Sequence, residues 1–146
     1  ITACDIRLAA SDARFSVRET KIAIVADLGT LQRLPLIVGQ GHARELAFTG
    51  KDLSAERAER MGLVNEVFTD ATALAAGAAA LAAEIAGNAP LTVRGVKRVL
   101  DFGTGRRVAD GLDYVAAWNS AFLASEDLGE ALGSFLEKRP AKFLGR

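Results

Sequence analysis

The first half of the chain alternates hydrophobic and polar residues over short distances. A period of two residues is typical of a β-strand with one buried face. Strands are predicted at residues 6–10, 14–17 and 63–68. Short helices are predicted at 28–38, 41–48 and 55–61, the last with Ser54 as its N-cap. Pro35 lies inside the first of these helices, where it removes a backbone hydrogen bond and favours a kink.

The second half has a helical period throughout. An alanine-rich stretch after Asp70 carries apolar residues at the spacing of one helix face: Leu74, Ala78, Leu81 and Ile85. Further helices are predicted at 90–102, 108–124 and 126–137, the last with Ser125 as its N-cap. The apolar faces of these helices are larger than the helices can bury by packing against one another. Part of that apolar surface is therefore expected to pack on another subunit.

Composition narrows the classes of function. Lysine and arginine together number 18, as do aspartate and glutamate, so no basic face for nucleic acid is expected. No apolar run approaches the roughly 20 residues that span a bilayer. Cys4 and His42 are the only residues of their kinds, which excludes an internal disulfide and argues against a zinc site built by this chain. Cys4, beside an apolar strand, is expected to be a small buried hydrophobe.

Two carboxylates flank the apolar run at residues 22–26, which is expected to be buried. Glu19 precedes the run, and Asp27 follows it where a helix is expected to begin. Two carboxylates held in one apolar pocket can move protons, because their surroundings can push their pKa values apart. A structural interpretation also fits, with Asp27 as the helix N-cap and Glu19 as a loop carboxylate in water. The spacing alone leaves both interpretations open.

Six motifs together resemble the second half of an enoyl-CoA hydratase/isomerase, a member of the crotonase superfamily. They are Ala-Cys-Asp-Ile-Arg-Leu-Ala at 3–9, Phe-Ser-Val-Arg-Glu at 15–19, Leu-Gln-Arg-Leu at 31–34, Glu-Leu-Ala-Phe-Thr-Gly at 45–50, Ala-Glu-Arg-Met-Gly-Leu-Val-Asn-Glu-Val at 58–67 and Phe-Leu-Glu-Lys-Arg-Pro at 135–140. The resemblance implies an α/β fold: the C-terminal part of a crotonase-like spiral of ββα units, followed by a helical trimerisation region. Residues 1–69 would belong to the crotonase core and residues 70–146 to the helical oligomerisation region.

Within this family the sequence most resembles the Δ3,5-Δ2,4-dienoyl-CoA isomerases. A Glu with an Asp eight residues later, followed by Leu-Gly-Thr-Leu-Gln-Arg-Leu-Pro, carries that resemblance, and Tyr-Val-Ala-Ala-Trp-Asn at 114–119 fits it. It implies that Glu19 takes a proton from C2 of a 3,5-dienoyl-CoA and that Asp27 delivers one at C6. Alternatives are an enoyl-CoA hydratase, a Δ3,Δ2-enoyl-CoA isomerase of fatty-acid β-oxidation, and a non-catalytic scaffold or RNA-binding relative with the same fold.

The resemblance also implies partners. The CoA thioester is the substrate and no other cofactor is expected. Phe135 and Lys138 match a family stretch that touches the CoA nucleotide of a neighbouring subunit, although helix core and helix-end cation are the structural interpretations. The oxyanion donors would come from an upstream half of the same protein, in a homotrimer or hexamer. No nucleic-acid or membrane partner is expected, and with no targeting signal in the chain the expected location is cytoplasmic.

Overall fold

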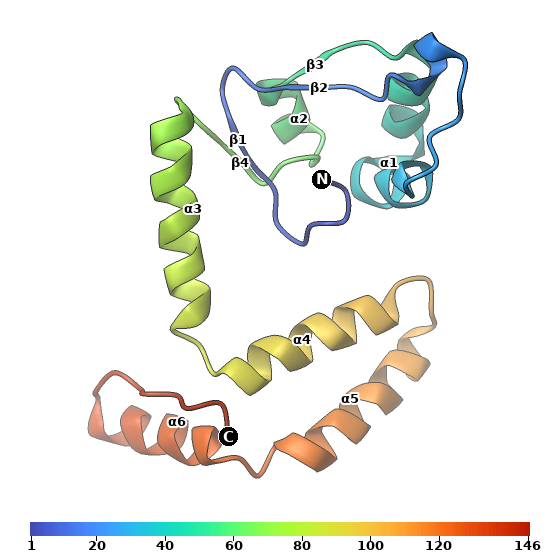
Figure 1. Cartoon of the computed structure of the whole chain (residues 1–146). Helices are drawn as coiled ribbons and strands as arrows, with labels where there is room; N and C mark the ends of the chain where they lie inside the picture. Colours follow the sequence, from blue (N-terminus) through green and yellow to red (C-terminus); the bar gives the residue numbers. More distant parts are fainter. The chain divides into compact units, whose positions relative to one another are not determined.

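The computed structural model describes residues 1–146 and separates into two units, Ile1–Ala79 and Ala80–Arg146 (Figure 1). The division falls inside helix α3 (Ala71–Ala86). All strands belong to the first unit, and the second contains only helices and an irregular C-terminal tail. The predicted change from mixed structure to helix along the chain is therefore confirmed.

Two short strand pairs organise the first unit. β1 (Leu8–Ala10) runs parallel to β4 (Glu66–Phe68). β2 (Arg14–Phe15) runs antiparallel to β3 (Leu53–Ser54), a strand that the hydrophobic pattern did not predict. A parallel pair needs a long connection, and here that connection carries β2, β3 and the helices of this unit before α3.

β1 and β4 are shorter than the strands predicted at 6–10 and 63–68, because side-chain and turn hydrogen bonds replace regular pairing before them. The Arg7 backbone N–H donates to the side-chain oxygen of Asn65 at 2.9 Å. The Leu63 N–H donates backwards to the Ala58 carbonyl at 2.8 Å. Residues 63–65 therefore form a turn, and strand pairing begins only after it.

Helix α1 (Thr30–Thr49) contains both helices predicted at 28–38 and 41–48. Gly39 has φ 79° and ψ 162°, outside the helical region, so two helical segments meet at a kink there and the predicted break between them is confirmed. Its first residue follows Gly29, whose φ is 83°. The helix therefore starts later than predicted, because a left-handed residue precedes Thr30.

Helix α2 (Ala55–Arg60) follows β3 directly. The Ser54 hydroxyl accepts a hydrogen bond from the Arg57 N–H at 3.3 Å, which confirms the predicted N-cap. Gly62, with φ 77°, lies in the turn after the helix. Ala55 and Ala58 are fully buried, so the small side chains of α2 let it approach the core closely.

The hydrophobic core lies entirely in the first unit. Leu46 and Leu53 are its largest fully buried side chains. The remaining core cluster is Ala9, Val17, Leu34, Val38, Ala43, Ala55, Ala58, Leu63 and Val64. Helix α1 contributes Leu34, Val38, Ala43 and Leu46 to this core.

The second unit contains α4 (Pro90–Gly103), α5 (Val108–Phe122) and α6 (Glu126–Glu137), close to the predicted ranges. α4 and α5 form a hairpin, visible in Figure 1. Their contacts include stacked rings of Phe102 and Tyr114, 4.4 Å apart. The absent side chain of Gly95 leaves room for the indole of Trp118, since a Cβ there would lie 2.4 Å from its nitrogen.

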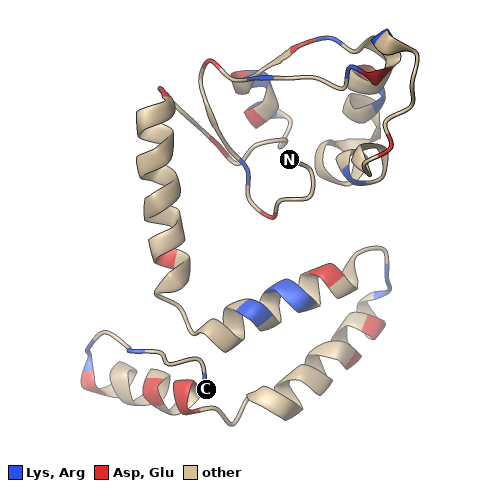
Figure 2. Cartoon of the chain, in the orientation of Figure 1, with Lys and Arg blue, Asp and Glu red and all other residues tan.

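No hydrophobic side chain of the second unit is buried within this chain. Leu100, Phe135 and Leu136 are 67%, 81% and 79% exposed. Figure 2 shows that α3 and α5 carry few charged residues. The predicted excess of apolar surface is present, and what covers it in the assembled protein stays a prediction.

One prediction about a single residue is wrong. Cys4 is exposed, because it lies in a turn before β1, where its N–H donates to the Ile1 carbonyl at 3.0 Å. By length and composition, no single helix reaches what a membrane span requires, although α3 and α4 would reach it if counted together.

Candidate active site

Glu19 is the first residue of a short 3-10 helix, η1 (Glu19–Ile22). The Lys21 N–H donates to the Arg18 carbonyl at 2.9 Å, and the Ile24 N–H donates to the Glu19 carbonyl at 3.1 Å. Ala23 closes the turn in the left-handed region, with φ 60°. Glu19 is partly buried, and the fixed turn limits the directions in which its carboxylate can point.

Asp27 lies in the loop between η1 and α1, and it is exposed. The alternative interpretation of Asp27 as the helix N-cap is wrong: the N-cap of α1 is Gly29, which makes no side-chain capping bond. Arg33 secures this loop instead, because its guanidinium donates to the Leu28 carbonyl at 2.7 Å. The same guanidinium donates to the Thr2 hydroxyl at 3.2 Å. The Asp27 carboxylate is left unused by the helix.

The apolar run between the two carboxylates was expected to be buried, and this is wrong for most of it. Ile22, Ile24 and Val25 are 66%, 54% and 76% exposed, and only Ala26 is buried. Residues 1–146 offer these side chains no apolar surface to pack on. The carboxylates therefore flank an apolar surface of the first unit rather than part of its core.

Neither carboxylate accepts a hydrogen bond or forms an ion pair within the chain. Other acids of the chain are engaged, such as Glu45 and Glu130, each bound by an arginine. Neither Glu19 nor Asp27 lines the cavity of about 300 Å³ in the first unit, which lies among Phe15, Leu34 and neighbouring residues. Carboxylates without internal partners are free to bind or transfer a proton.

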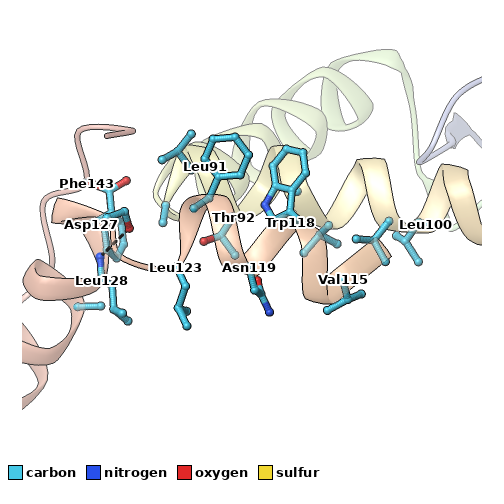
Figure 3. Close-up of a pocket in the computed structure, with 17 residues that line it drawn as sticks. Leu91, Thr92, Leu100, Val115, Trp118, Asn119, Leu123, Asp127, Leu128 and Phe143 are labelled. Carbon is cyan, nitrogen blue, oxygen red and sulfur yellow. Dashed lines mark hydrogen bonds between the residues drawn. The ribbon is translucent and has the colours of Figure 1, made fainter. Parts of the chain in front are cut away.

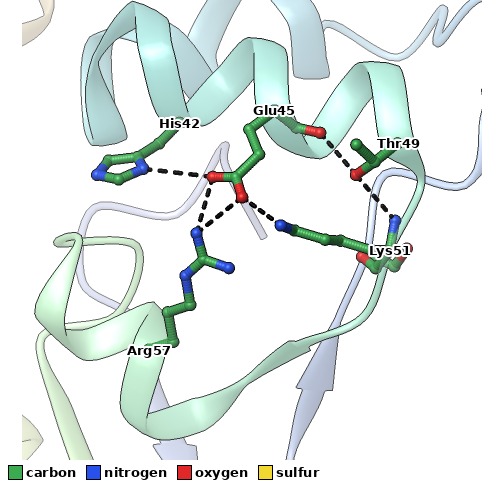
Figure 4. A network of polar contacts seen from close by, with 6 residues as sticks. His42, Glu45, Thr49, Lys51 and Arg57 are labelled. Carbon is green, nitrogen blue, oxygen red and sulfur yellow. Dashed lines mark hydrogen bonds and ion pairs between the residues drawn. The ribbon is translucent and has the colours of Figure 1, made fainter.

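Glu45 is the most heavily paired carboxylate of the first unit (Figure 4). Arg57 donates to both of its oxygens at 2.9 and 2.8 Å, and Lys51 donates to one of them. The His42 ring nitrogen lies 3.7 Å from it. The hydrogen bonds from Lys51 and then Arg57 lower the pKa of Glu45 to about 2. The spacing of basic residues after Glu45 was the only sequence signal for this site, and it was missed.

The proposed CoA-contacting residues lie at the end of α6, in the second unit. Phe135 is 81% exposed, so the alternative of a helix-core side chain is wrong within this chain. Lys138 is exposed and caps α6 in the left-handed region, with φ 54°. Both positions leave the side chains available to a ligand, and their contact with CoA stays a prediction.

A largely apolar cavity of about 360 Å³ lies among α4, α5, α6 and the tail (Figure 3). Asp127 lines it and is 4% exposed. Its carboxylate accepts hydrogen bonds from the Leu144 and Gly145 N–H groups at 2.7 and 2.9 Å. Asp127 thus fastens the tail, which brings Phe143 to the cavity wall. The hydrophobic pattern gave no sign of this role for Asp127.

Comparison with known proteins agrees with the motifs. The family model described as Enoyl-CoA hydratase/isomerase matches residues 1–146. The chain is 54% identical over 143 residues to "Delta(3,5)-Delta(2,4)-dienoyl-CoA isomerase, mitochondrial" of Dictyostelium discoideum, covering 98% of this chain and 49% of that protein. It is 50% identical to the isomerase of the same name, "peroxisomal", of Arabidopsis thaliana, covering 98% of this chain and 51% of that protein.

A solved structure shows the same fold. The crystal structure of an enoyl-CoA hydratase from Bacillus anthracis matches with a TM-score of 0.95 at 35% identity, covering 99% of this chain and 56% of that one. The chain thus spans about half the length of the relatives it matches. The expected cytoplasmic location is wrong, because the names of the relatives point to mitochondria or peroxisomes.

Proposed function

Because this chain belongs to the enoyl-CoA hydratase/isomerase family, we propose that the protein carrying it is a Δ3,5-Δ2,4-dienoyl-CoA isomerase. One observation carries the proposal: a chain 54% identical to such an isomerase holds two carboxylates, Glu19 and Asp27, that its own fold leaves unpaired. The names of the relatives favour a mitochondrial or peroxisomal setting.

The proposed reaction moves two conjugated double bonds by two proton transfers. Glu19 removes a proton from C2, and the electron pair of the broken C2–H bond forms the new C2–C3 double bond. The C3–C4 pair moves to C4–C5, and the C5–C6 pair takes a proton from Asp27 at C6. Two groups are needed because the two carbons lie four bonds apart along the acyl chain. Proton transfer by placed side chains is general acid–base catalysis.

The charge that develops on the thioester oxygen needs hydrogen-bond donors aimed at it. In this proposal they come from an upstream half of the same protein. Phe135 and Lys138 would contact the CoA nucleotide of a neighbouring subunit, with Lys138 meeting a phosphate as a point charge. The assembly would be a homotrimer or hexamer built on the exposed apolar helices of the second unit. The isomerisation involves no net oxidation or reduction. The CoA thioester of the substrate therefore provides the activation that the reaction requires.

The test uses single substitutions in the full-length protein with 3,5-dienoyl-CoA, followed by the ultraviolet absorbance of the 2,4-dienoyl product. Asp27→Asn and Glu19→Gln should each lower turnover by roughly 10²–10⁴-fold, the usual contribution of a general acid or base. Asp12→Asn and Glu66→Gln, at exposed carboxylates of the same unit, are the matched controls and should remain at the wild-type rate.

Proton exchange at C2 separates the two roles. Glu19→Gln should abolish exchange of the C2 proton with solvent, whereas Asp27→Asn should leave it largely intact. Equal loss of exchange in both variants would contradict this division of labour. Hydration of 2-enoyl-CoA without any dienoyl turnover would point to a hydratase, and the absence of both activities would favour a non-catalytic relative.

A further inference from the structure

Four side chains around Glu19 are tied to one other piece of the chain, residues 47–52, called here the anchor segment. The Ser16 hydroxyl donates to the Gly50 and Lys51 carbonyls at 3.2 and 3.1 Å. Arg18 forms an ion pair with Asp52, and the Thr20 hydroxyl donates to the Ala47 carbonyl. Positions 16, 18 and 20 thus bracket Glu19 on both sides.

Lys21 adds a packing contact to these polar ones. Its aliphatic chain lies over Gly50, where a Cβ atom would come within 3.0 Å of the lysine Cγ. Gly50 has φ 55°, and its N–H donates to the Leu46 carbonyl at 2.9 Å. A glycine therefore suits this position twice, by its backbone conformation and by the space that the lysine occupies.

The anchor segment is itself held by Glu45. The Thr49 hydroxyl donates to the Glu45 carbonyl at 2.7 Å, and the Lys51 N–H donates to that hydroxyl at 3.3 Å. The Glu45 carboxylate binds Lys51 from the segment and Arg57 from α2 (Figure 4). One side chain on α1 thereby joins the segment to the next helix.

Hydrophobic burial anchors the chain on either side of the Glu19 turn, at Val17 and Ala26, but not the turn itself. η1 has no buried residue, and Ile22, Ile24 and Val25 after it are mostly exposed. Within the turn, Glu19 is held by the polar tethers and by the turn's own backbone hydrogen bonds. Placement matters to catalysis, because a misplacement of about 1 Å can cost about 10²-fold in rate.

We propose that the anchor segment, held by Glu45, is a positioning element for Glu19. The proposal rests on the proposed role of Glu19 as the base, and it adds Thr20 and Glu45 as positioning residues. Neither needs to touch the substrate. Thr20 acts on the turn next to the base, and Glu45 acts on the segment that holds Thr20.

Thr20→Val in the full-length protein removes the tether and keeps the shape of the side chain. Turnover of 3,5-dienoyl-CoA should fall about tenfold, with KM changed by less than about twofold, because positioning acts on the chemical step. Thr20→Ser restores the hydroxyl and should restore the rate. Thr104→Val removes a similar threonine bond, to the Leu100 carbonyl in the second unit, and should match the wild type.

Glu45→Gln should lower turnover in the same way, and its effect should not add fully to that of Thr20→Val, because both act through one segment. Glu56→Gln, at an exposed ion pair with Arg60 on α2, is its control. Hydrogen exchange of the Ile24 amide, which donates to the backbone carbonyl of Glu19, gives a readout that does not depend on activity. It should speed up by about tenfold or less in Thr20→Val, as expected for losing one hydrogen bond.

Two outcomes separate this inference from the proposed function. If Glu19→Gln is inactive while Thr20→Val and Glu45→Gln keep the wild-type rate, the positioning role is overturned and the proposed function stands. If Glu19→Gln is fully active, the proposed function fails and a role in placing a base fails with it. Unchanged exchange of the Ile24 amide in Thr20→Val would show that the tether does not hold the turn, whatever the activity.

Discussion

The two units of this chain use hydrophobic residues in opposite ways. In Ile1–Ala79 they form a buried core, with Leu46 and Leu53 essentially inaccessible to solvent. In Ala80–Arg146 the helices are as well formed, yet no hydrophobic side chain is buried. The difference shows that regular helices do not by themselves make a hydrophobic core. The second unit has regular helices whose apolar faces are left uncovered by its own residues.

Polar contacts are distributed more evenly between the two units than hydrophobic contacts are. Each unit holds a carboxylate bound by basic groups, Glu45 in the first and Glu130 in the second. In the second unit a buried acid, Asp127, also fastens the C-terminal tail. The first unit thus combines a buried core with polar anchors, whereas the second has polar anchors and no buried hydrophobic side chain.

Removing a core side chain should have the largest effect. Leu46→Ala in the full-length protein should lower the free energy of unfolding by about 2–5 kcal/mol, the usual cost of a cavity in place of a buried leucine. Leu36→Ala, on the same helix but 71% exposed, should change it by less than about 0.5 kcal/mol. Denaturant titration measures both. An equal loss at Leu36 would mean that this exposed face is covered in the whole protein.

Changing the apolar face of α6 should affect assembly rather than the first unit. Leu132→Asp places a charge where a leucine is 60% exposed. If that face packs on another subunit, dissociation should become at least about tenfold easier, since removing a well-packed side chain from the centre of an interface costs about 2 kcal/mol or more. Light scattering after size exclusion measures the assembly. An unchanged oligomer would remove α6 from the proposed interface.

Loosening the tail should have a smaller, local effect. Asp127→Asn removes one of two acceptor oxygens from a pair of backbone N–H groups, so it should cost about 1–3 kcal/mol. Amides 144 and 145 should exchange faster, whereas those of β1 and β4 should be unaffected. Faster exchange in the strands as well would show that the two units unfold together.

Much of this architecture could be predicted from sequence, and the failures have a common cause. Helix periods and the Ser54 and Ser125 caps located α2 to α6, because these signals are local. The predictions for Cys4 and for the run at 22–26 failed because burial depends on what packs against a residue, and periodicity does not show that. The Glu45 contacts join residues 6 and 12 positions apart, so no single element's pattern contained them.

Lowering the pH should decrease the stability of both units, and of all these changes it should have the smallest effect. Hydrogen bonds from Lys51 and Arg57 lower the pKa of Glu45 from 4.5 to about 2, and those from Arg139 and the Lys142 N–H do the same for Glu130. A carboxyl group whose pKa is lower in the folded state than in the unfolded state stabilises the fold. That stability is complete above the pKa of the unfolded state and is lost as the pH falls from about 4.5 towards about 2.

Glu45→Gln should therefore flatten the pH dependence of the first unit's amide exchange in that window, and Glu130→Gln should flatten that of the second unit's amide exchange. The changes should be modest, since both carboxylates are solvent-accessible and salt screens them. If either variant flattened the pH dependence in both units equally, the polar anchors would be coupled across the chain, and the two units would unfold as one.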